Sequence, residues 1–148
     1  MKFSHFLLSE VKNLKESNTT IKTTFDIKTR SWYENALSVL NINNVTNYIA
    51  SDNITYNGTT FKKNYYILYQ DIVHEIIDIL LHNNLDGTKT IFLVLQEQIC
   101  FKDAHFNCYD IIKPIPELKF ISINYVQFKP SQSHTLNDGK KVFKVTFL

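Results

Sequence analysis

The sequence is poor in glycine and cysteine, and both shortages exclude common kinds of site. Gly58, Gly87 and Gly139 are its only glycines, and because they stand alone they exclude a glycine-rich phosphate-binding loop. Cys100 and Cys108 are its only cysteines, too few for a disulfide framework in a chain of 148 residues. We therefore expect free thiols and an intracellular location, in the cytoplasm or the nucleus.

Arginine and long apolar runs are also scarce. Arg30 is the single arginine, and the net charge is +2. Because arginine is the preferred reader of phosphate and guanine, this composition makes nucleic acid a weak candidate partner. No apolar run approaches the length of a membrane span, and residues 1–10 are apolar too briefly for a signal peptide. We therefore expect no membrane partner.

The residues that are abundant predict a single folded domain over residues 1–148. Hydrophobic residues make up 44% and charged residues 20% of the chain, which argues against disorder. Aromatic residues reach 14%, and the rings of Phe and Tyr suit the half-buried surface of a sheet. The expected fold class is α+β and mainly β, with a helical extension over residues 1–47 and a β-rich core over residues 48–148.

The predicted extension contains two helix signals and one strand signal. Apolar residues recur at helical spacing over residues 3–16. Residues 20–28 alternate between apolar and polar and predict a short strand. Ser31 followed by Glu34 is a capping-box pattern, which predicts that Ser31 caps a second helix.

Turn signals delimit the strands of the predicted core. Asn57-Gly58 and Asn137 to Lys140 each predict a hairpin. Residues 72–82 fit either a helix or a strand, and we choose a strand because the turn at 83–87 then joins it to the apolar strand 90–95. Further strands are expected at residues 65–70, 98–101, 108–113, 120–128 and 142–148, with Pro114 and Pro116 marking a linker or an edge crossing.

Cysteine and histidine give no clear site. No pair of these residues has the close spacing of a zinc site, so we predict no metal and no cofactor. A Cys–His nucleophile stays open, because such partners come together only in the folded chain. The residues concerned are Cys100, Cys108, His74, His105 and His134.

Three carboxylates form the one acidic group of interest. Asp71, Glu75 and Asp78 lie within eight residues of one another. If they converge, they would suit metal-assisted phosphoryl chemistry. If they do not, they are a solvated polar face, which is the more common role of such residues.

Aromatic side chains are concentrated in residues 48–69. Alternate rings on a strand share one face of a sheet, and small barrels use such faces to hold peptides, methylated lysine or stacked bases. The alternative is that the rings simply pack the core and its edge. The candidate binding residues are Tyr56, Phe61, Tyr65, Tyr66 and Tyr69.

The order of apolar residues, turn and strand from Ile54 to Leu68 resembles the opening of SH3-like and BAH-like β-barrels. Residues 75–80 and 91–95 resemble their second and third strands, and residues 134–143 resemble the C-terminal ends of transposon-derived animal proteins. The resemblance spans residues 48–148 and implies a small antiparallel barrel or curled sheet. Chromatin-reading relatives would imply a histone-tail or DNA-associated partner.

The sequence therefore supports three hypotheses. The first is a non-enzymatic binding module, without catalytic residues, that recognises a peptide or a chromatin- or nucleic-acid-associated protein through an aromatic surface. The second is a small metal-dependent, nuclease-like enzyme that uses Asp71, Glu75 and Asp78. The third is a protein of a virus or mobile element that blocks a host partner through a sheet edge.

Overall fold

The computed structural model describes residues 19–40, 47–103 and 108–147, and these residues form a mainly β, antiparallel structure with one α-helix. The helix expected at residues 3–16 lies outside the described residues. The sheets of the described part are not closed into a barrel. A helix of membrane-spanning length and apolarity is not found among the described residues.

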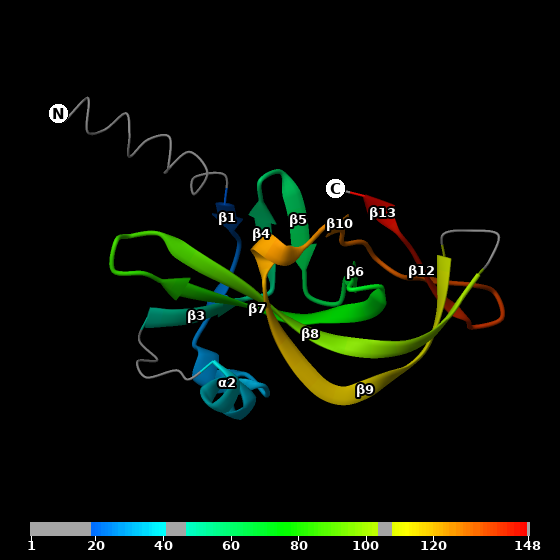
Figure 1. The fold of residues 1–148 in the computed structure, drawn as a ribbon, viewed down its shortest axis with the longest axis horizontal. Coiled ribbons are helices and arrows are strands. Elements are labelled where there is room, and N and C mark those ends of the chain that lie inside the picture. The colour runs from blue at the N-terminus through cyan, green and yellow to red at the C-terminus, as the bar shows by residue number, and fades with distance from the viewer. Residues whose placement is uncertain (1–18, 41–46, 104–107, 148) are drawn as a thin grey trace.

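The described residues form three sheets, whose strands are labelled in Figure 1. The main sheet has the order β11-β12-β9-β8-β7-β3-β2, with β6 also paired to β7, and the smaller sheets are β1-β4-β5 and β10-β13. The elements are β1 (Thr19–Ile21), β2 (Thr24–Phe25), η1 (Ile27–Thr29), α2 (Tyr33–Val39), β3 (Tyr48–Ser51), β4 (Asn53–Tyr56), β5 (Thr59–Lys62), β6 (Tyr66–Tyr69), β7 (Ile72–Asn83), β8 (Lys89–Lys102), β9 (Cys108–Ser122), η3 (Ile123–Tyr125), β10 (Phe128–Lys129), β11 (His134–Thr135), β12 (Lys141–Lys144) and β13 (Thr146–Phe147).

The predicted hairpins are confirmed. Asn57 and Gly58 join β4 to β5 with φ values of 51° and 81°, the left-handed pair that a two-residue type I′ turn requires. The strand chosen for residues 72–82 is β7, which pairs with β8 across the turn at 83–87. The turn before Lys140 joins β11 to β12, with Gly139 at a φ of 84°.

Two predicted strand boundaries are wrong. Residues 98–101 are not a separate strand but the end of β8, and β9 runs from residue 108 to 122 through both prolines. The prolines fit because β9 bulges there, with Pro114 paired to Gln98 and Leu118 to Gln96. Beyond Ile111, β9 pairs with β8 alone among the described strands, so no ladder on its outer side needs the missing proline N–H groups.

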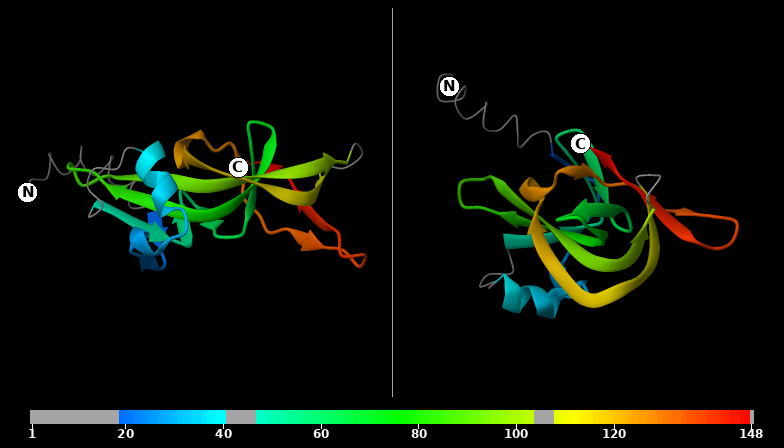
Figure 2. Two further views of the ribbon diagram at one scale, coloured as in Figure 1. Left: turned by 90° about the horizontal axis from the view of Figure 1, so that it is seen from below. Right: turned by 45° about the vertical axis from the view of Figure 1, so that its right-hand side comes forward.

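The long strands β8 and β9 curl together, and β9 sweeps around the outside of β8 (Figure 2). Both strands carry register shifts, between Gln96 and Gln98 and between Ile99 and Cys100. Such bulges bend a strand and raise its twist. β12 then continues the main sheet by pairing antiparallel with the first residues of β9, Cys108 to Ile111.

A third bulge, in β7, divides the core. The register of β7 with β8 shifts between Ile76 and Asp78, so Ile77 has no partner in β8. A regular strand points residues three apart to opposite faces, yet Ile76 and Ile79 contact one apolar cluster while Ile77 and Leu80 contact another. The bulge thus adds one residue, Ile77, to the side of β7 that faces the second cluster, while the rest of the strand alternates between the two clusters.

Three apolar clusters fill the structure. The first lies between the main sheet and the β4–β5 hairpin, the second lies against η1 and α2, and the third is formed mainly by side chains of β6, β7, β9 and β12. Each fully buried Ile or Leu contributes about 1.5 to 3 kcal/mol. Their main members are Ile54, Phe61, Ile76, Ile79, Leu93 and Leu95 in the first, Ile27, Trp32, Ala36, Leu80 and Val94 in the second, and Tyr66, Leu68, Val73, Tyr109 and Phe143 in the third.

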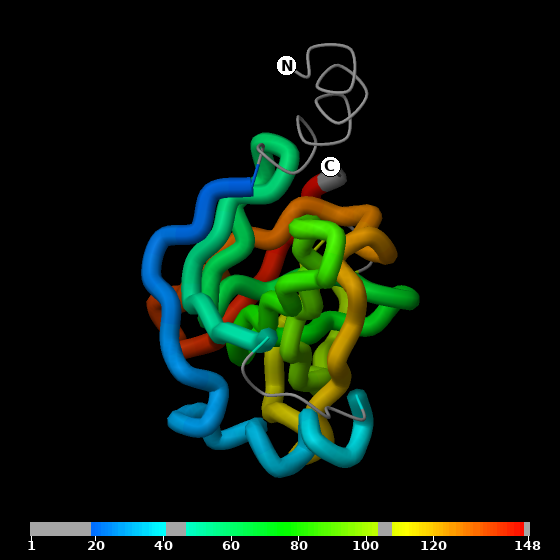
Figure 3. Tube along the Cα trace, turned by 90° about the vertical axis from the view of Figure 1, so that its left-hand side faces the viewer, coloured from blue at the N-terminus to red at the C-terminus, as the bar shows by residue number. Residues whose placement is uncertain are grey.

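Residues 19–40 are part of this core. Strands β1 and β2 pair with β4 and β3, so the strands begin before Tyr48 (Figure 3). Helix α2 forms near its predicted place, but its cap differs from the prediction. The residue at the N-cap is Trp32 rather than Ser31, and it makes no side-chain capping bond because an indole has an N–H donor but no oxygen to accept a backbone N–H; its ring is buried in the second cluster.

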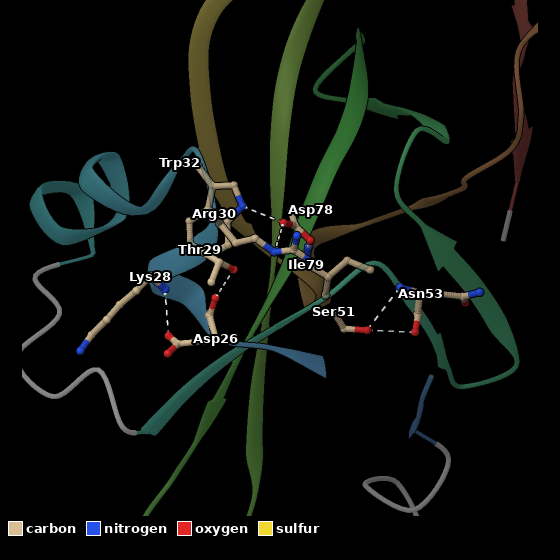
Figure 4. A network of polar contacts seen from close by, with 9 residues as sticks. All are labelled: Asp26, Lys28, Thr29, Arg30, Trp32, Ser51, Asn53, Asp78 and Ile79. Carbon is tan, nitrogen blue, oxygen red and sulfur yellow. Dashed lines mark hydrogen bonds and ion pairs between the residues drawn. The ribbon is translucent and has the colours of Figure 1, made fainter. Parts of the chain in front are cut away.

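A buried carboxylate ties this segment to β7 (Figure 4). The indole N–H of Trp32 donates to Oδ2 of Asp78 at 2.9 Å, and Nε of Arg30 lies 3.1 Å from the same oxygen. Oδ1 of Asp78 accepts the backbone N–H of Ile79 at 3.0 Å. The guanidinium also lies 3.9 Å from the ring centroid of Phe25, a cation–π contact. Burial raises the pKa of Asp78 despite these three partners.

Candidate functional site

The five aromatic residues predicted to bind a ligand do not share one exposed surface. Phe61 is 2% exposed in the first cluster, and Tyr66 is 4% exposed in the third. Tyr56, Tyr65 and Tyr69 are half-buried at the margin of the first cluster. Two of the five rings are therefore core residues, and the other three are partly available to a ligand.

Two shallow grooves lie on either side of residues 123–128. We call the surface that they form the tyrosine rim. One groove has a volume of about 240 Å³ and the other of about 360 Å³. The first is lined by Leu68, Tyr69, Gln70, Tyr125, Gln127 and Phe128, and the second by Tyr56, Asn57, Thr59, Phe61, Ile123, Asn124 and Val126.

Two tight turns fix the backbone positions of Tyr56 and Tyr69 in the rim. Tyr56 ends β4 immediately before the Asn57-Gly58 turn, and its hydroxyl donates to Oδ1 of Asn124 at 2.9 Å. Tyr69 ends β6 immediately before Gln70 and Asp71, whose φ values of 52° and 63° make a second left-handed turn. These turns fix the backbone on which each ring is carried.

Tyr125, the most exposed ring of the rim, was missed from the sequence. It is 68% exposed and belongs to η3, which Ser122 caps by accepting the backbone N–H of Asn124 at 3.3 Å. The sequence predicts a continuous strand over residues 120–128, so it gives Tyr125 no special place. The serine two residues before Asn124 is the local signal that could have identified the turn.

The rim is chemically neutral. Its lining residues are aromatic, aliphatic, amide and hydroxyl side chains, and neither groove is lined by an Asp, Glu, Lys, Arg or His. Such a surface offers apolar contact and amide or hydroxyl hydrogen bonds. It offers no general acid or base and no charge for a phosphate.

The three clustered carboxylates do not converge. Asp71 is exposed in the β6–β7 turn, Glu75 lies opposite Tyr66, and Asp78 is bonded to Trp32. No group of three His, Cys, Asp or Glu among the described residues is placed to hold a metal ion. The proposed metal-dependent use of these three carboxylates is therefore wrong.

The cysteine–histidine pairing gains no support from the described residues. Burial and the nearby Asp110 raise the pKa of Cys100 to about 11, which keeps its sulfur protonated and a poor nucleophile. Both cysteines are free and half-buried. His134 is exposed on β11, and His105 lies outside the described residues.

His74 is fully buried and hydrogen-bonded as a neutral ring. Its Nδ1 lies 2.9 Å from the carbonyl of Ile72, so it must donate there, which leaves Nε2 to accept from the ammonium of Lys119 at 3.2 Å. Lys119 also pairs with Glu97 at 3.2 Å. Burial and then the charge of Lys119 lower the pKa of His74 to about 4.

This arrangement is structural rather than catalytic. A histidine with a pKa of about 4 and both ring nitrogens occupied is a poor proton shuttle near neutral pH. The tyrosine rim is the surface on which several predicted residues come together. No protein-family model, curated protein or solved structure matches the chain.

Proposed function

We propose that the chain is a non-enzymatic binding module that holds an extended peptide segment of a partner protein across the tyrosine rim. The observation that carries this proposal is the exposure of Tyr125, 68%, in the groove that also contains Tyr69. Tyrosine gives a large, rigid contact area at little entropic cost, and such rings dominate peptide-binding surfaces.

The neutral lining favours a peptide over a nucleic acid. A phosphate backbone needs lysine or arginine along its path, and neither groove has one in its lining. A peptide needs apolar contact for alternate side chains and a few donors and acceptors for its backbone. Phe128 and Leu68 supply apolar contact in one groove, and Asn124 supplies hydrogen-bonding groups in the other.

The finer features expected from the sequence are also part of this proposal. The meander β6-β7-β8-β9 and its curl support a distant relation of residues 48–148 to SH3-like or BAH-like barrels, in an open form. A protein associated with chromatin is then one class of partner. The free thiols of Cys100 and Cys108 support a reducing, intracellular location.

A displayed library of random peptides tests the proposal directly. We expect selection against the native protein to enrich peptides with apolar residues at alternate positions, because alternate side chains of an extended peptide point to one side. The Tyr69→Ala, Tyr125→Ala double variant should bind the enriched peptides at least about tenfold more weakly, since each buried aromatic anchor contributes about 1 to 2 kcal/mol.

Phe101→Ala is the matched control. Phe101 is 67% exposed, nearly the same as Tyr125, but it lies on β8 and lines neither groove. Its replacement should leave the affinity unchanged. Failure to enrich any peptide, or equal losses in the control and in the double variant, would exclude the rim as a peptide site.

A further inference from the structure

A polar cleft lies beside the third apolar cluster, which contributes Tyr66 to its lining. It has a volume of about 470 Å³ and is bordered by residues 111–114 of β9 and by the start of β12 with the turn before it. We call it the Glu75 cleft. Its polar lining consists of Tyr66, Glu75, Gln98, Lys113, Lys140 and Lys141.

Glu75 is the unusual residue of this cleft. It is half-buried on β7, paired with Tyr66 on one side and Gln96 on the other. Its carboxylate makes no hydrogen bond or salt bridge with any residue that the structure describes. Burial raises its pKa, and Lys141 and Lys63 oppose this shift from a distance. A half-buried carboxylate without a direct protein partner keeps its oxygens available to accept hydrogen bonds from water or from a ligand.

Two deeply buried polar side chains stand beside it. Gln98 is 5% exposed and uses its amide N–H to reach the carbonyl of Gln96 at 3.1 Å, which leaves its side-chain oxygen available as an acceptor. Tyr66 is 4% exposed, and its hydroxyl accepts from Nζ of Lys141 at 3.3 Å. Burial raises the pKa of Tyr66, so the O–H proton stays on the ring and remains free to donate.

The opposite wall of the cleft is cationic. Lys140 is neutralised by Asp110 at 3.4 Å, whereas Lys113 and Lys141 make no salt bridge with a described residue. The cleft therefore combines one carboxylate with two ammonium groups, those of Lys113 and Lys141, that have no salt-bridge partner among the described residues, and the charge of Lys141 also acts on Glu75. A ligand that matches these charges carries one positive group and two negative charges.

We propose that the Glu75 cleft binds a small phosphorylated amine, with the ligand ammonium on Glu75 and Gln98 and its phosphate on Lys113 and Lys141. The hydroxyl of Tyr66 lies between the two ends and donates to the phosphate. Each half of the ligand then meets the groups that its chemistry prefers: acceptors for the ammonium and donors for the phosphate. This site is separate from the tyrosine rim, so it adds a second ligand to the proposed peptide module.

Titrations with three probes test the assignment. O-phosphoethanolamine carries both groups, inorganic phosphate carries the anion alone, and ethylamine carries the cation alone. We expect O-phosphoethanolamine to bind about tenfold or more tightly than either single-charge probe, because a hydrogen-bonded charge contributes about one to two powers of ten in affinity. Amide chemical shifts should move in β6, β7, β8, β9 and β12, the strands that line the cleft.

Two variants separate the two ends of the ligand. Glu75→Gln should reduce the affinity for O-phosphoethanolamine to that for phosphate and leave phosphate binding unchanged or stronger. Lys141→Met should weaken both phosphate-containing probes. The controls are Glu117→Gln and Lys129→Met, exposed residues outside the cleft, which should bind as the native chain does.

Three results would overturn the assignment. The first is that no probe binds at millimolar concentration, which would leave the cleft a solvent-filled gap. The second is that phosphate binds as tightly as O-phosphoethanolamine, and the third is that Glu75→Gln binds the zwitterion as tightly as the native chain. None of these results bears on the tyrosine rim, which the peptide selection tests independently.

Discussion

The buried neutral histidine should make the protein lose stability in mild acid. The pKa of His74 is about 4 in the folded chain against 6.5 in an unfolded one. Between pH 6.5 and pH 4, His74 is protonated in the unfolded chain but neutral in the folded chain. The free energy of unfolding therefore falls as the pH drops through 6.5 and levels off near pH 4. The full shift corresponds to about 3 kcal/mol, of which about 2 kcal/mol is lost by pH 5.

Urea denaturation at pH 7.5 and pH 5.0 measures this loss, with the fluorescence of Trp32, the single tryptophan, as the probe. Carboxylates also titrate in this range, and the raised pKa values of Glu75 and Asp78 act in the opposite direction. The comparison therefore uses His74→Gln. The difference in unfolding free energy between the two pH values should be smaller by about 2 kcal/mol in this variant than in the native chain.

Two further variants show where the shift comes from. His134→Gln removes an exposed histidine and should keep the native pH dependence. Lys119→Met removes the cation that lies 3.2 Å from Nε2 and should recover part of the loss at pH 5. If His74→Gln and the native chain lose the same stability between pH 7.5 and 5.0, the reasoning that His74 stays neutral in the fold is refuted.

Three other changes have outcomes that follow from the fold. Asp78→Asn should lower the free energy of unfolding by about 3 kcal/mol in urea denaturation at pH 7, because it leaves the largely buried Arg30 without its counter-ion. The control, Asp71→Asn at an exposed position, should change the free energy of unfolding by less than about 0.5 kcal/mol. An equal effect of the two would show that the pair is not buried. Gly58→Ala should cost about 1 kcal/mol, seen as a lower melting temperature, because alanine is strained at a φ of 81°; an unchanged melting temperature would contradict this turn geometry. Deletion of Ile77 should preserve the cooperative unfolding transition, because the pairs Ile76–Leu95 and Asp78–Val94 then follow each other directly and every remaining side chain of β7 keeps its face; loss of the transition would mean that the bulge itself is required.

Local signals predicted the hairpins of this fold well. Asn57-Gly58 has a backbone requirement that two residues alone impose, so it could be recognised without any knowledge of the rest of the chain. The choice of a strand for residues 72–82 was also correct, because an apolar strand and a turn followed it in the sequence. In both cases the deciding contacts are close in sequence.

The lengths of β8 and β9 depend on contacts that are far apart in sequence. Glu97 and Gln98 break the apolar run of β8, and Pro114 and Pro116 break that of β9, so each strand looks like two. The bulges that accommodate these residues exist only when the two strands pair, and no single segment encodes them.

The candidate sites were predictable only in part, for the same reason. Tyr56 and Tyr69 could be chosen because they belong to an aromatic segment, but Tyr125 reaches the rim through a short turn that lies far along the chain. The sequence suggests Glu75 as a metal ligand, whereas its place in one cleft with Tyr66 and Lys141 depends on how β6, β7 and β12 come together. The composition shows which residues have side chains that could bind a ligand, whereas the strand register determines which of these side chains lie close together.

The prolines of β9 also affect how the protein behaves at high concentration. A strand whose outer side is unpaired is a template onto which another chain can add, the first step of fibre growth. Pro114 and Pro116 cannot donate to such an added strand, and Lys113 and Glu117 place charges beside them. The residues that interrupt the sequence pattern of β9 therefore oppose the addition of a strand from another chain. Replacing both prolines with valine should make the folded protein prone to form fibres while changing its core little.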